Sequence, residues 1–273
     1  MRSSTALVCA MAVSACTGTE GDLLRTKPGS EPPADAATAR PRPGALSSWQ
    51  IQLTGTLDTS LDVQVYISDL ETPAQVIGSL HSSNRIVICY FSAGTMEPFR
   101  DDASGFPASS LGAPLENYPD ERWVDVRDMA VRSIMRARLE RAAEAGCDGV
   151  HPSGLAAFLV NTELDFTRSD QIAYDRWLST VAHGLGLSIG LVDGDATLSR
   201  ELLADFDWTV VFSCLDTGCA AAAPFVAAAK AAFLIEYGDE SRAFEVCPKA
   251  KSLGLSAILK RDSDLDAFRV GCP

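Results

Sequence analysis

The sequence is poor in positive charge and in histidine, and both shortages limit what it can bind. Its 273 residues include 23 Lys and Arg against 36 Asp and Glu, which gives a formal net charge of −13 and a pI near 4.6. A long-range field of that sign disfavours nucleic acid and anionic lipid as partners, and it attracts a cationic polymer. The chain has only 3 His, and none is near the Cys-x4-Cys pair at Cys214 and Cys219. This pair also lacks a second cysteine pair of matching spacing. We therefore expect neither a metal site nor a nucleic acid partner.

Long apolar runs are also absent, and the N-terminal apolar run is too short to cross a bilayer. Residues 1–16 carry one positive charge, at Arg2, followed by a short apolar stretch. This pattern is typical of a secretory signal. The stretch ends in Val13-Ser14-Ala15-Cys16, which resembles the bacterial lipobox, where cleavage before the cysteine frees its thiol for lipid attachment. We predict a signal peptide over 1–15 and an exported lipoprotein held at the cell envelope through Cys16 alone. An ordinary signal peptide and a secreted protein are the alternative.

The segment that follows has almost no large apolar residue with which to build a core. Residues 16–47 are rich in Pro, Ala, Gly and Thr, a composition typical of a semi-extended tether. Residues 48–273 remain, and their number suits a single (β/α)8 domain.

Six cysteines lie in that domain, and an even number in an exported domain indicates disulfides. They allow 15 pairings, among which the sequence does not choose. We favour the pairs Cys89 with Cys147, Cys214 with Cys219, and Cys247 with Cys272.

Short apolar, β-prone runs alternate with segments of helical spacing throughout the domain. The eight runs cover 49–53, 63–67, 85–91, 148–152, 187–192, 208–214, 232–237 and 256–260. The helical segments cover 72–81, 126–145, 170–185, 196–206, 223–231 and 242–253. Such alternation yields a parallel sheet, and eight strands in one domain of this size predict an α/β fold of the closed TIM-barrel type. A doubly wound sheet would carry a G-x-G-x-x-G turn after an early strand. The turn at Thr54-Gly55-Thr56 lacks this motif, so we expect neither a nucleotide nor another cofactor.

In a TIM barrel the chemistry lies where strands end at the C-terminal face, so residues just past each run are the candidate site. Several of them are acidic, basic or aromatic. The candidates for binding a substrate are Tyr66, Asp69, Tyr90, Glu97, Arg100, His151, Asp193, Glu236, Tyr237 and Lys260.

Several blocks in the same order as these candidates resemble one family. They are Trp49-Gln50-Ile51-Gln52-Leu53-Thr54-Gly55, Val87-Ile88-Cys89-Tyr90-Phe91-Ser92-Ala93-Gly94, Gly146-Cys147-Asp148-Gly149, Asp207-Trp208, Glu236-Tyr237 and Leu259-Lys260-Arg261, with Glu97, Arg100 and Asp102. Together they resemble the endo-α-1,4-polygalactosaminidases, family 114 of the glycoside hydrolases. The resemblance covers 49–273, and it implies an exported barrel that acts on galactosamine-containing polysaccharides.

The resemblance also implies that the catalytic acids are missing. After Gly146-Cys147-Asp148-Gly149 the family continues with a hydrophobic residue and then Glu-Pro-Asp-Asn, whose aspartate is one catalytic carboxylate and falls on Ser153. The second comes from an Asn-Glu-Gln-Cys motif, whose glutamate falls on Phe212. Glycoside cleavage needs two carboxyl groups, and loss of one general acid or base costs about 10²–10⁴-fold in rate. His151, Ser153 and Asp193 also invite a Ser-His-Asp interpretation, but no G-x-S-x-G elbow surrounds Ser153.

The sequence therefore predicts a carbohydrate-binding pseudoenzyme whose partner is a polysaccharide, most simply a cationic galactosamine polymer. The first alternative is an active glycosidase with relocated acids at Asp69, Glu97, Asp193 or Glu236. The second is a non-carbohydrate interaction module of the cell envelope.

Overall fold

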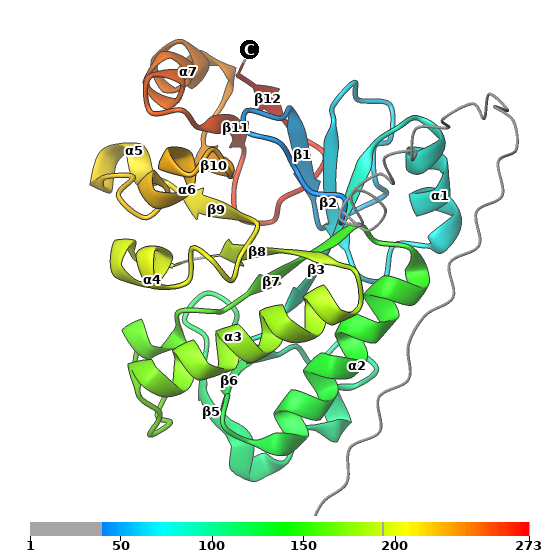
Figure 1. Cartoon of the computed structure of the whole chain (residues 1–273), viewed down its shortest axis with the longest axis vertical. Helices are drawn as coiled ribbons and strands as arrows, with labels where there is room; N and C mark the ends of the chain where they lie inside the picture. The colour runs from blue at the N-terminus through cyan, green and yellow to red at the C-terminus, as the bar shows by residue number, and fades with distance from the viewer. Residues whose placement is uncertain (1–39, 193, 273) are drawn as a thin grey trace, which may run out of the picture. The chain divides into compact units, whose positions relative to one another are not determined.

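The computed structural model describes residues 40–192 and 194–272, and in it eight parallel strands follow one another in chain order (Figure 1). They are β1 (Trp49–Gln52), β2 (Val65–Asp69), β3 (Ile86–Ser92), β7 (Gly149–Ser153), β8 (Ser188–Val192), β9 (Trp208–Phe212), β10 (Ala231–Tyr237) and β11 (Ser256–Lys260). A short strand, β12 (Val270–Gly271), adds to β11 in the antiparallel direction.

Side-chain hydrogen bonds join the first and last parallel strands. The indole Nε1 of Trp49 on β1 donates to the carbonyl oxygen of Ser256 on β11 at 2.9 Å. The Nζ of Lys260 on β11 donates to the carbonyl oxygen of Ile51 on β1 at 2.9 Å. The sheet thus curls into a nearly closed barrel, and the prediction of a (β/α)8 fold is confirmed.

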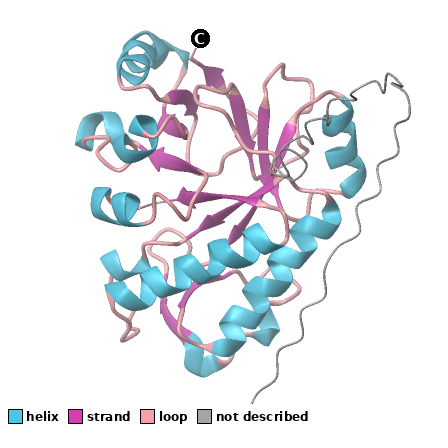
Figure 2. Cartoon of the chain, viewed as in Figure 1, coloured by secondary structure: helices cyan, strands magenta, loops and turns pink. Residues whose placement is uncertain are grey.

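Helices lie outside the strands, as Figure 2 shows. They are α1 (Ala74–Ser82), α2 (Met129–Ala145), α3 (Arg168–Gly184), α4 (Ala196–Glu201), α5 (Cys214–Thr217), α6 (Ala223–Ala227) and α7 (Ala243–Ser252), with 3₁₀ turns at Ala103–Gly105, Ala108–Ser110, Ala157–Leu159 and Glu240–Arg242. Local signals explain the longest two. The Asp128 carboxylate caps α2 by accepting from Ala130 N, and Gly146 ends it with φ +89°. Thr167 and Asp170 form a capping box at the start of α3.

Three elements end two or more residues earlier than the sequence predicted. Helix α4 was expected to reach residue 206 but stops at Glu201. Helix α6 was expected to reach residue 231, but Ala229 takes φ +54° and the chain then enters β10. Strand β9 was expected to reach residue 214, but Ser213 takes φ +44° and begins the turn into α5.

The sequence did not predict the small sheet inserted between β3 and α2. Strands β4 (Thr95–Met96), β5 (Leu111–Pro114) and β6 (Arg122–Val124) pair in the antiparallel order β4-β6-β5. Arg122 holds two of them together, because its Nε and Nη2 both donate to the Gly112 carbonyl oxygen, at 2.8 and 2.6 Å. We call residues 95–125 the insertion.

The core has an inner and an outer layer, which alternate along every strand. Inside the barrel lie side chains such as Ile67, Trp208 and Phe233, all fully buried. Between barrel and helices lie others, such as Val87 and Leu234. Because successive side chains of a strand point to opposite sides, this alternation decides which residue at a strand end can reach a pocket at the barrel mouth.

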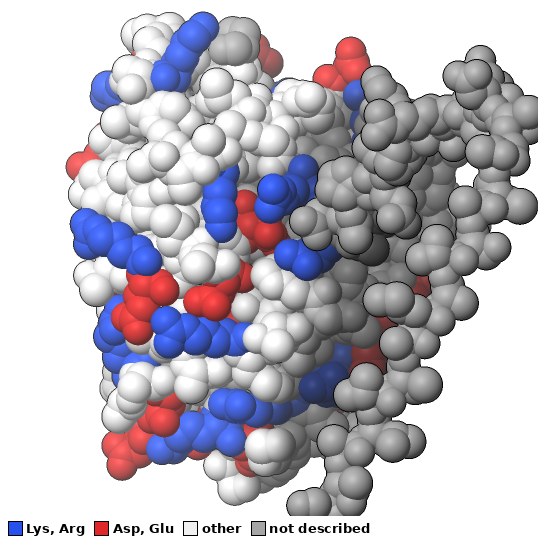
Figure 3. All heavy atoms as spheres, in the orientation of Figure 1, with Lys and Arg blue, Asp and Glu red and all other residues white. Residues whose placement is uncertain are grey.

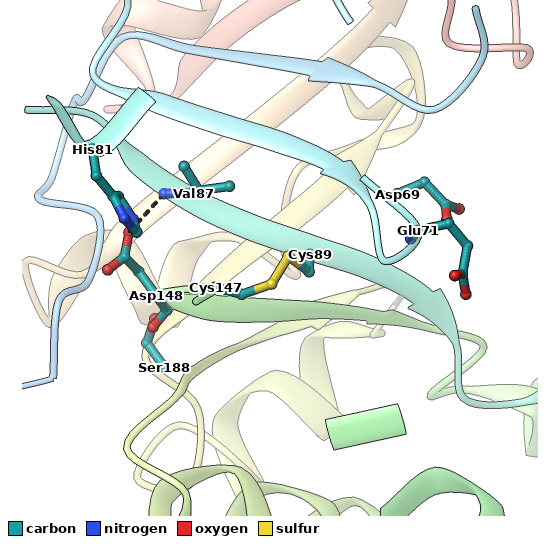
Figure 4. Close-up of a disulfide and its surroundings, with 8 residues drawn as sticks. All are labelled: Asp69, Glu71, His81, Val87, Cys89, Cys147, Asp148 and Ser188. Carbon is teal, nitrogen blue, oxygen red and sulfur yellow. Dashed lines mark hydrogen bonds and ion pairs between the residues drawn. A yellow bond between two sulfur atoms is a disulfide. The ribbon is translucent and has the colours of Figure 1, made fainter. Parts of the chain in front are cut away.

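All three expected disulfides form. Cys89 bonds Cys147, Cys214 bonds Cys219, and Cys247 bonds Cys272. The first joins β3 to the residue that leads into β7 (Figure 4).

Asp148, next to that disulfide, ties together three parts of the chain. Its Oδ2 accepts from Val87 N at 2.8 Å and lies 2.9 Å from His81 Nε2, as Figure 4 shows. Its main-chain oxygen accepts from the Ser188 hydroxyl at 3.1 Å. Gly149 must be glycine here, because a Cβ would come within 2.8 Å of the Ser188 carbonyl oxygen. The Gly-Cys-Asp-Gly block therefore fixes β7 between its two neighbours.

The chain is packed against the barrel before residue 48, where the sequence placed the start of the domain. Pro43 and Ser47 are buried, and Gly44 forms an antiparallel bridge with Lys230. The expected signal peptide, Cys16 and most of the expected tether lie outside the described residues. Within the described ranges no helix is long and apolar enough to cross a membrane. On the face in Figure 3, acidic and basic side chains are interspersed.

Candidate functional site

A pocket of about 620 Å³ opens at the C-terminal ends of the strands, where the fold predicts the site. Its walls come from barrel strands, from the insertion and from the loop after β11. The lining residues are Leu53, Thr54, Asp69, Glu71, Tyr90, Ser92, Thr95, Glu97, Phe99, Leu115, Tyr118, Glu121, Trp123, His151, Ser153, Gly154, Val192, Phe212, Tyr237, Ser263, Asp264 and Leu265. Five of them are carboxylates and none is Lys or Arg. Asp69, Glu71 and Glu97 pair with arginines, and within the described ranges no such pair involves Glu121 or Asp264, so these two carboxylates can attract a cation.

One wall is held by a buried guanidinium group. The Nη2 of Arg100 donates to Asp69 Oδ2 at 2.8 Å, and its Nε donates to Glu97 Oε2. The Arg100 side chain is 1% exposed and that of Glu97 is 3% exposed. Burial alone would lower the pKa of Arg100, but hydrogen bonds and charges from both carboxylates outweigh it and raise this pKa. Asp69 and Glu97 are therefore partners of Arg100.

A second buried guanidinium supports the first. The Nε and Nη2 of Arg138 on α2 donate hydrogen bonds to the Asp102 carboxylate at 2.8 and 2.7 Å. Its Nη1 donates to the Ser92 carbonyl oxygen at 2.6 Å. Burial raises the pKa of Asp102, but the bidentate contact with Arg138 outweighs it and lowers this pKa below its usual range. The insertion is thus tied to α2 and to the end of β3.

The pocket floor carries three side chains from β3 and β7. The hydroxyl of Ser153 donates to the Tyr90 hydroxyl oxygen at 3.2 Å. His151 lies between the rings of Tyr90 and Trp208, at centroid distances of 5.7 and 5.8 Å. Burial lowers the pKa of His151 to about 3, so its ring is neutral. Its Nδ1 has no partner among the described residues. No bond joins Ser153 to His151 in the described ranges, so a Ser-His pair is not assembled.

Glu121 differs from the other carboxylates of the pocket. It lies in the turn before β6 and accepts a hydrogen bond from Thr95 Oγ1 at 3.0 Å. Burial raises its pKa above the usual range, while the Thr95 bond lowers it less. Among the described residues no Lys, Arg or His lies within ion-pair distance of Glu121. Its charge is therefore available to a ligand.

Seven of the residues named from the sequence do line the pocket. They are Asp69, Tyr90, Glu97, His151, Ser153, Phe212 and Tyr237. Asp193 lies outside the described residues.

Four other candidates do not line it, and in each case the side chain points elsewhere. Tyr66 faces the helix layer, where its hydroxyl donates to the Leu61 carbonyl oxygen at 2.7 Å. Arg100 lies behind the wall, bound to its two carboxylates. The Oε1 of Glu236 accepts from Leu215 N at 3.0 Å, on the side of β10 opposite Tyr237. Lys260 is fully buried at the barrel seam, where burial lowers its pKa to about 8.

The sequence missed most of the part of the site that the insertion supplies, of which it named only Glu97 among the lining residues. Phe99, Tyr118, Glu121 and Trp123 all come from residues 95–125, and Asp264 comes from the loop after β11. The length of the connection after β3 was the one sequence feature that could have indicated this part of the site. More than 30 residues separate β3 from α2, against the 2–6 usual for a βα loop, and long ordered loops are commonly functional.

The arrangement suits recognition of a polar, positively charged ligand with flat apolar faces. Carboxylates receive ammonium groups, and exposed aromatic rings stack on sugar rings. The described residues contain no group of three or more His, Cys, Asp or Glu placed to hold a metal ion.

Comparisons with known proteins agree with the fold. The family model for glycoside-hydrolase family GH114 matches residues 30–273. The structure of Ega3 from Aspergillus fumigatus, in complex with galactosamine, matches with a TM-score of 0.81 and 32% identity, over 86% of this chain and 98% of that one. The glycoside hydrolase domain of PelA from Pseudomonas aeruginosa shares the fold, with a TM-score of 0.65 and 15% identity over 82% of this chain and 98% of that domain. No similar sequence was found among curated proteins.

Proposed function

Because the chain belongs to glycoside hydrolase family GH114, we propose that it binds an amino-sugar polymer in the barrel pocket without cleaving it. We further propose that it is exported and lipid-anchored through Cys16. The observation that carries the binding proposal is the identity of two pocket residues, Ser153 and Phe212.

These two residues take the positions that the family resemblance assigns to the catalytic acids. Both line the pocket, so the places where acids would act face the ligand space. Glycoside cleavage needs one carboxyl group to protonate the leaving oxygen and another to attack or to activate water. The Ser153 hydroxyl cannot do either at neutral pH, and the Phe212 ring carries no ionisable group.

Three of the acids that the sequence offered as replacements, Asp69, Glu97 and Glu236, are engaged in other contacts. Asp69 and Glu97 neutralise Arg100. Glu236 accepts from a backbone amide outside the pocket and lies 3.8 Å from Arg242 Nη2. These three engagements support binding over hydrolysis.

The acidity of the pocket supports a cationic polymer as the ligand. Its lining holds five carboxylates without a lining cation, and among the described residues Glu121 and Asp264 have no arginine or lysine partner. Ega3, at 32% identity, was solved with galactosamine, an amino sugar. An ammonium-bearing sugar chain matches both observations.

The test measures binding and cleavage together. The full-length chain is incubated with de-N-acetylated galactosamine polymer, and retention of polymer and new reducing ends are both measured. We expect retention without new reducing ends. The variant Ser153→Asp/Phe212→Glu, which restores both acids, is expected to release reducing ends, and Ser153→Asp alone serves as its control. Reducing ends released by the unmodified chain would refute the binding-only function.

One observation favours a second candidate, residual hydrolysis. A pocket carboxyl group whose pKa is raised by burial is what a general acid requires, and Glu121 is such a group. If the unmodified chain releases reducing ends and Glu121→Gln abolishes their release, hydrolysis is the function. If the chain retains no polymer, the envelope interaction module is favoured.

The lipid anchor is tested separately. Labelled fatty acid incorporated in a bacterial host is expected on the unmodified chain and absent from Cys16→Ala. A secreted chain without label would refute the anchor and leave the binding proposal unchanged.

A further inference from the structure

We infer that the wall of the pocket formed by the insertion is a further sugar subsite, which holds another amino-sugar residue of the same polymer. This inference rests on the proposed function, because the ligand is the same polymer. The residues that carry it are Phe99, Tyr118, Glu121 and Trp123, which we call the platform.

The aromatic side chains of the platform are more exposed than folding alone explains. Phe99 is 69% exposed and Tyr118 is 42% exposed, and both line the pocket. Burying an aromatic ring is strongly favourable, so two exposed rings beside a pocket indicate a contact surface. The guanidinium of Arg100 lies 5.2 Å from the centroid of the Phe99 ring and supports it. Such supported rings suit stacking against the C–H face of a sugar.

The platform is held in place by its own sheet. Leu115 N donates to the Glu121 carbonyl oxygen at 3.1 Å, and Glu121 N donates to the Tyr118 carbonyl oxygen at 2.9 Å. Trp123 pairs with Thr95 in the register between β4 and β6. The backbone positions of Tyr118, Glu121 and Trp123 are therefore fixed before a ligand arrives, which reduces the entropy cost of binding.

The Glu121 carboxylate gives the platform its chemical preference. Thr95 donates to its Oε2, and the described residues provide no cation for it. A carboxylate that is half buried, charged and without a counter-ion gains most from a ligand that brings an ammonium group. A neutral N-acetylated sugar could stack on the rings but would leave this charge unpaired. The platform is therefore specific for the amine form.

The platform residues and the residues at the strand ends line different walls of one pocket of about 620 Å³, so a chain of linked sugars can contact both walls at once. Affinity should rise with the number of linked amino sugars until the platform is occupied. Loss of Phe99 or Glu121 should reduce this gain in affinity with length.

The experiment compares ligands of increasing length on matched variants. Galactosamine and de-N-acetylated galactosamine oligomers are titrated into the full-length chain by calorimetry. Phe99→Ala is expected to weaken oligomer binding about 2–10-fold, from the loss of one stacking contact. Glu121→Gln is expected to weaken it about tenfold or more, from the loss of a charged hydrogen bond. Monomer binding should weaken less than oligomer binding in either variant. The controls are Phe244→Ala, which removes an 83% exposed ring on α7, and Glu140→Gln, which neutralises an exposed acid on α2.

Each result decides a separate question. Weaker oligomer binding by both platform variants, with unchanged controls and unchanged thermal unfolding, supports the platform. Oligomer binding by both variants equal to that of the unmodified chain overturns it and leaves the proposed function standing. An equal loss for N-acetylated oligomers in Glu121→Gln overturns the amine preference. If the unmodified chain binds no amino-sugar polymer at all, the proposed function itself fails.

Discussion

The three disulfides should contribute unequally to stability, in the order of the loops they close. Cross-linking removes loop entropy from the unfolded chain, by an amount that grows as 1.5R ln n with the number n of residues in the loop. The separations are 58 residues for Cys89 and Cys147, 25 for Cys247 and Cys272, and 5 for Cys214 and Cys219. The loop-entropy relation then gives contributions of about 4, 3.5 and 2 kcal/mol in that order.

The test uses three double Cys→Ala variants and urea unfolding under non-reducing conditions. The variant without the bond from Cys89 to Cys147 should lose about 2 kcal/mol more than the variant without the bond from Cys214 to Cys219. A comparison of midpoints is valid where the slopes m agree, and a changed m would show that the unfolded state itself has become less compact. The fully reduced unmodified chain provides the limit for loss of all three. If removal of the five-residue loop is the most destabilising change, the loop-entropy argument is wrong for this barrel.

Three further predictions concern buried or half-buried charges. Arg100→Met leaves Asp69 and Glu97 without their partner, so we expect it to lower the free energy of unfolding, measured in urea, by about 3–5 kcal/mol. Arg100→Lys should lower it less. An unchanged unfolding midpoint in Arg100→Met would refute the role of these ion pairs. Asp175 is fully buried, and burial raises its pKa well above the usual range, so its contribution to stability is present at acid pH and is lost as pH rises. Asp175→Asn keeps an acceptor for Gln171 Nε2 and removes the ionisable group. It should therefore stabilise the fold by at least about 1 kcal/mol at pH 8 and make its stability depend less on pH. Identical curves of unfolding free energy against pH for the variant and the unmodified chain would contradict this. Because burial raises the pKa of Glu121, lowering the pH should protonate it before exposed acids and weaken binding of the cationic oligomer, and Glu121→Gln should abolish that part of the pH dependence measured by calorimetry.

The strands were predictable because each is a short apolar run in a barrel that is buried on both sides. Residues 256–260 are the clearest case, with the same bounds in the sequence prediction and in β11. Helix ends were less predictable. Ala229 ends α6 through a positive φ that no glycine or asparagine announced.

The site was predicted in part, because being at a strand end does not say which way a side chain points. Tyr237 lines the pocket and its neighbour Glu236 does not, since successive side chains of β10 alternate. Both sides of a barrel strand are apolar, so the sequence pattern does not show this direction. Phe99 and Glu121 were missed for another reason. They belong to an added sheet rather than to the repeating strand and helix pattern.

The bridge between Gly44 and Lys230 has a consequence for how the protein would be oriented. Lys230 immediately precedes β10, and Trp49 begins β1, so the described chain joins the barrel at the N-terminal ends of its strands. The pocket and the platform are at the opposite ends. The proposed lipid anchor would therefore be attached on the side of the barrel opposite the pocket. A polymer from the surroundings could then bind in the pocket without passing the point where the tether is attached.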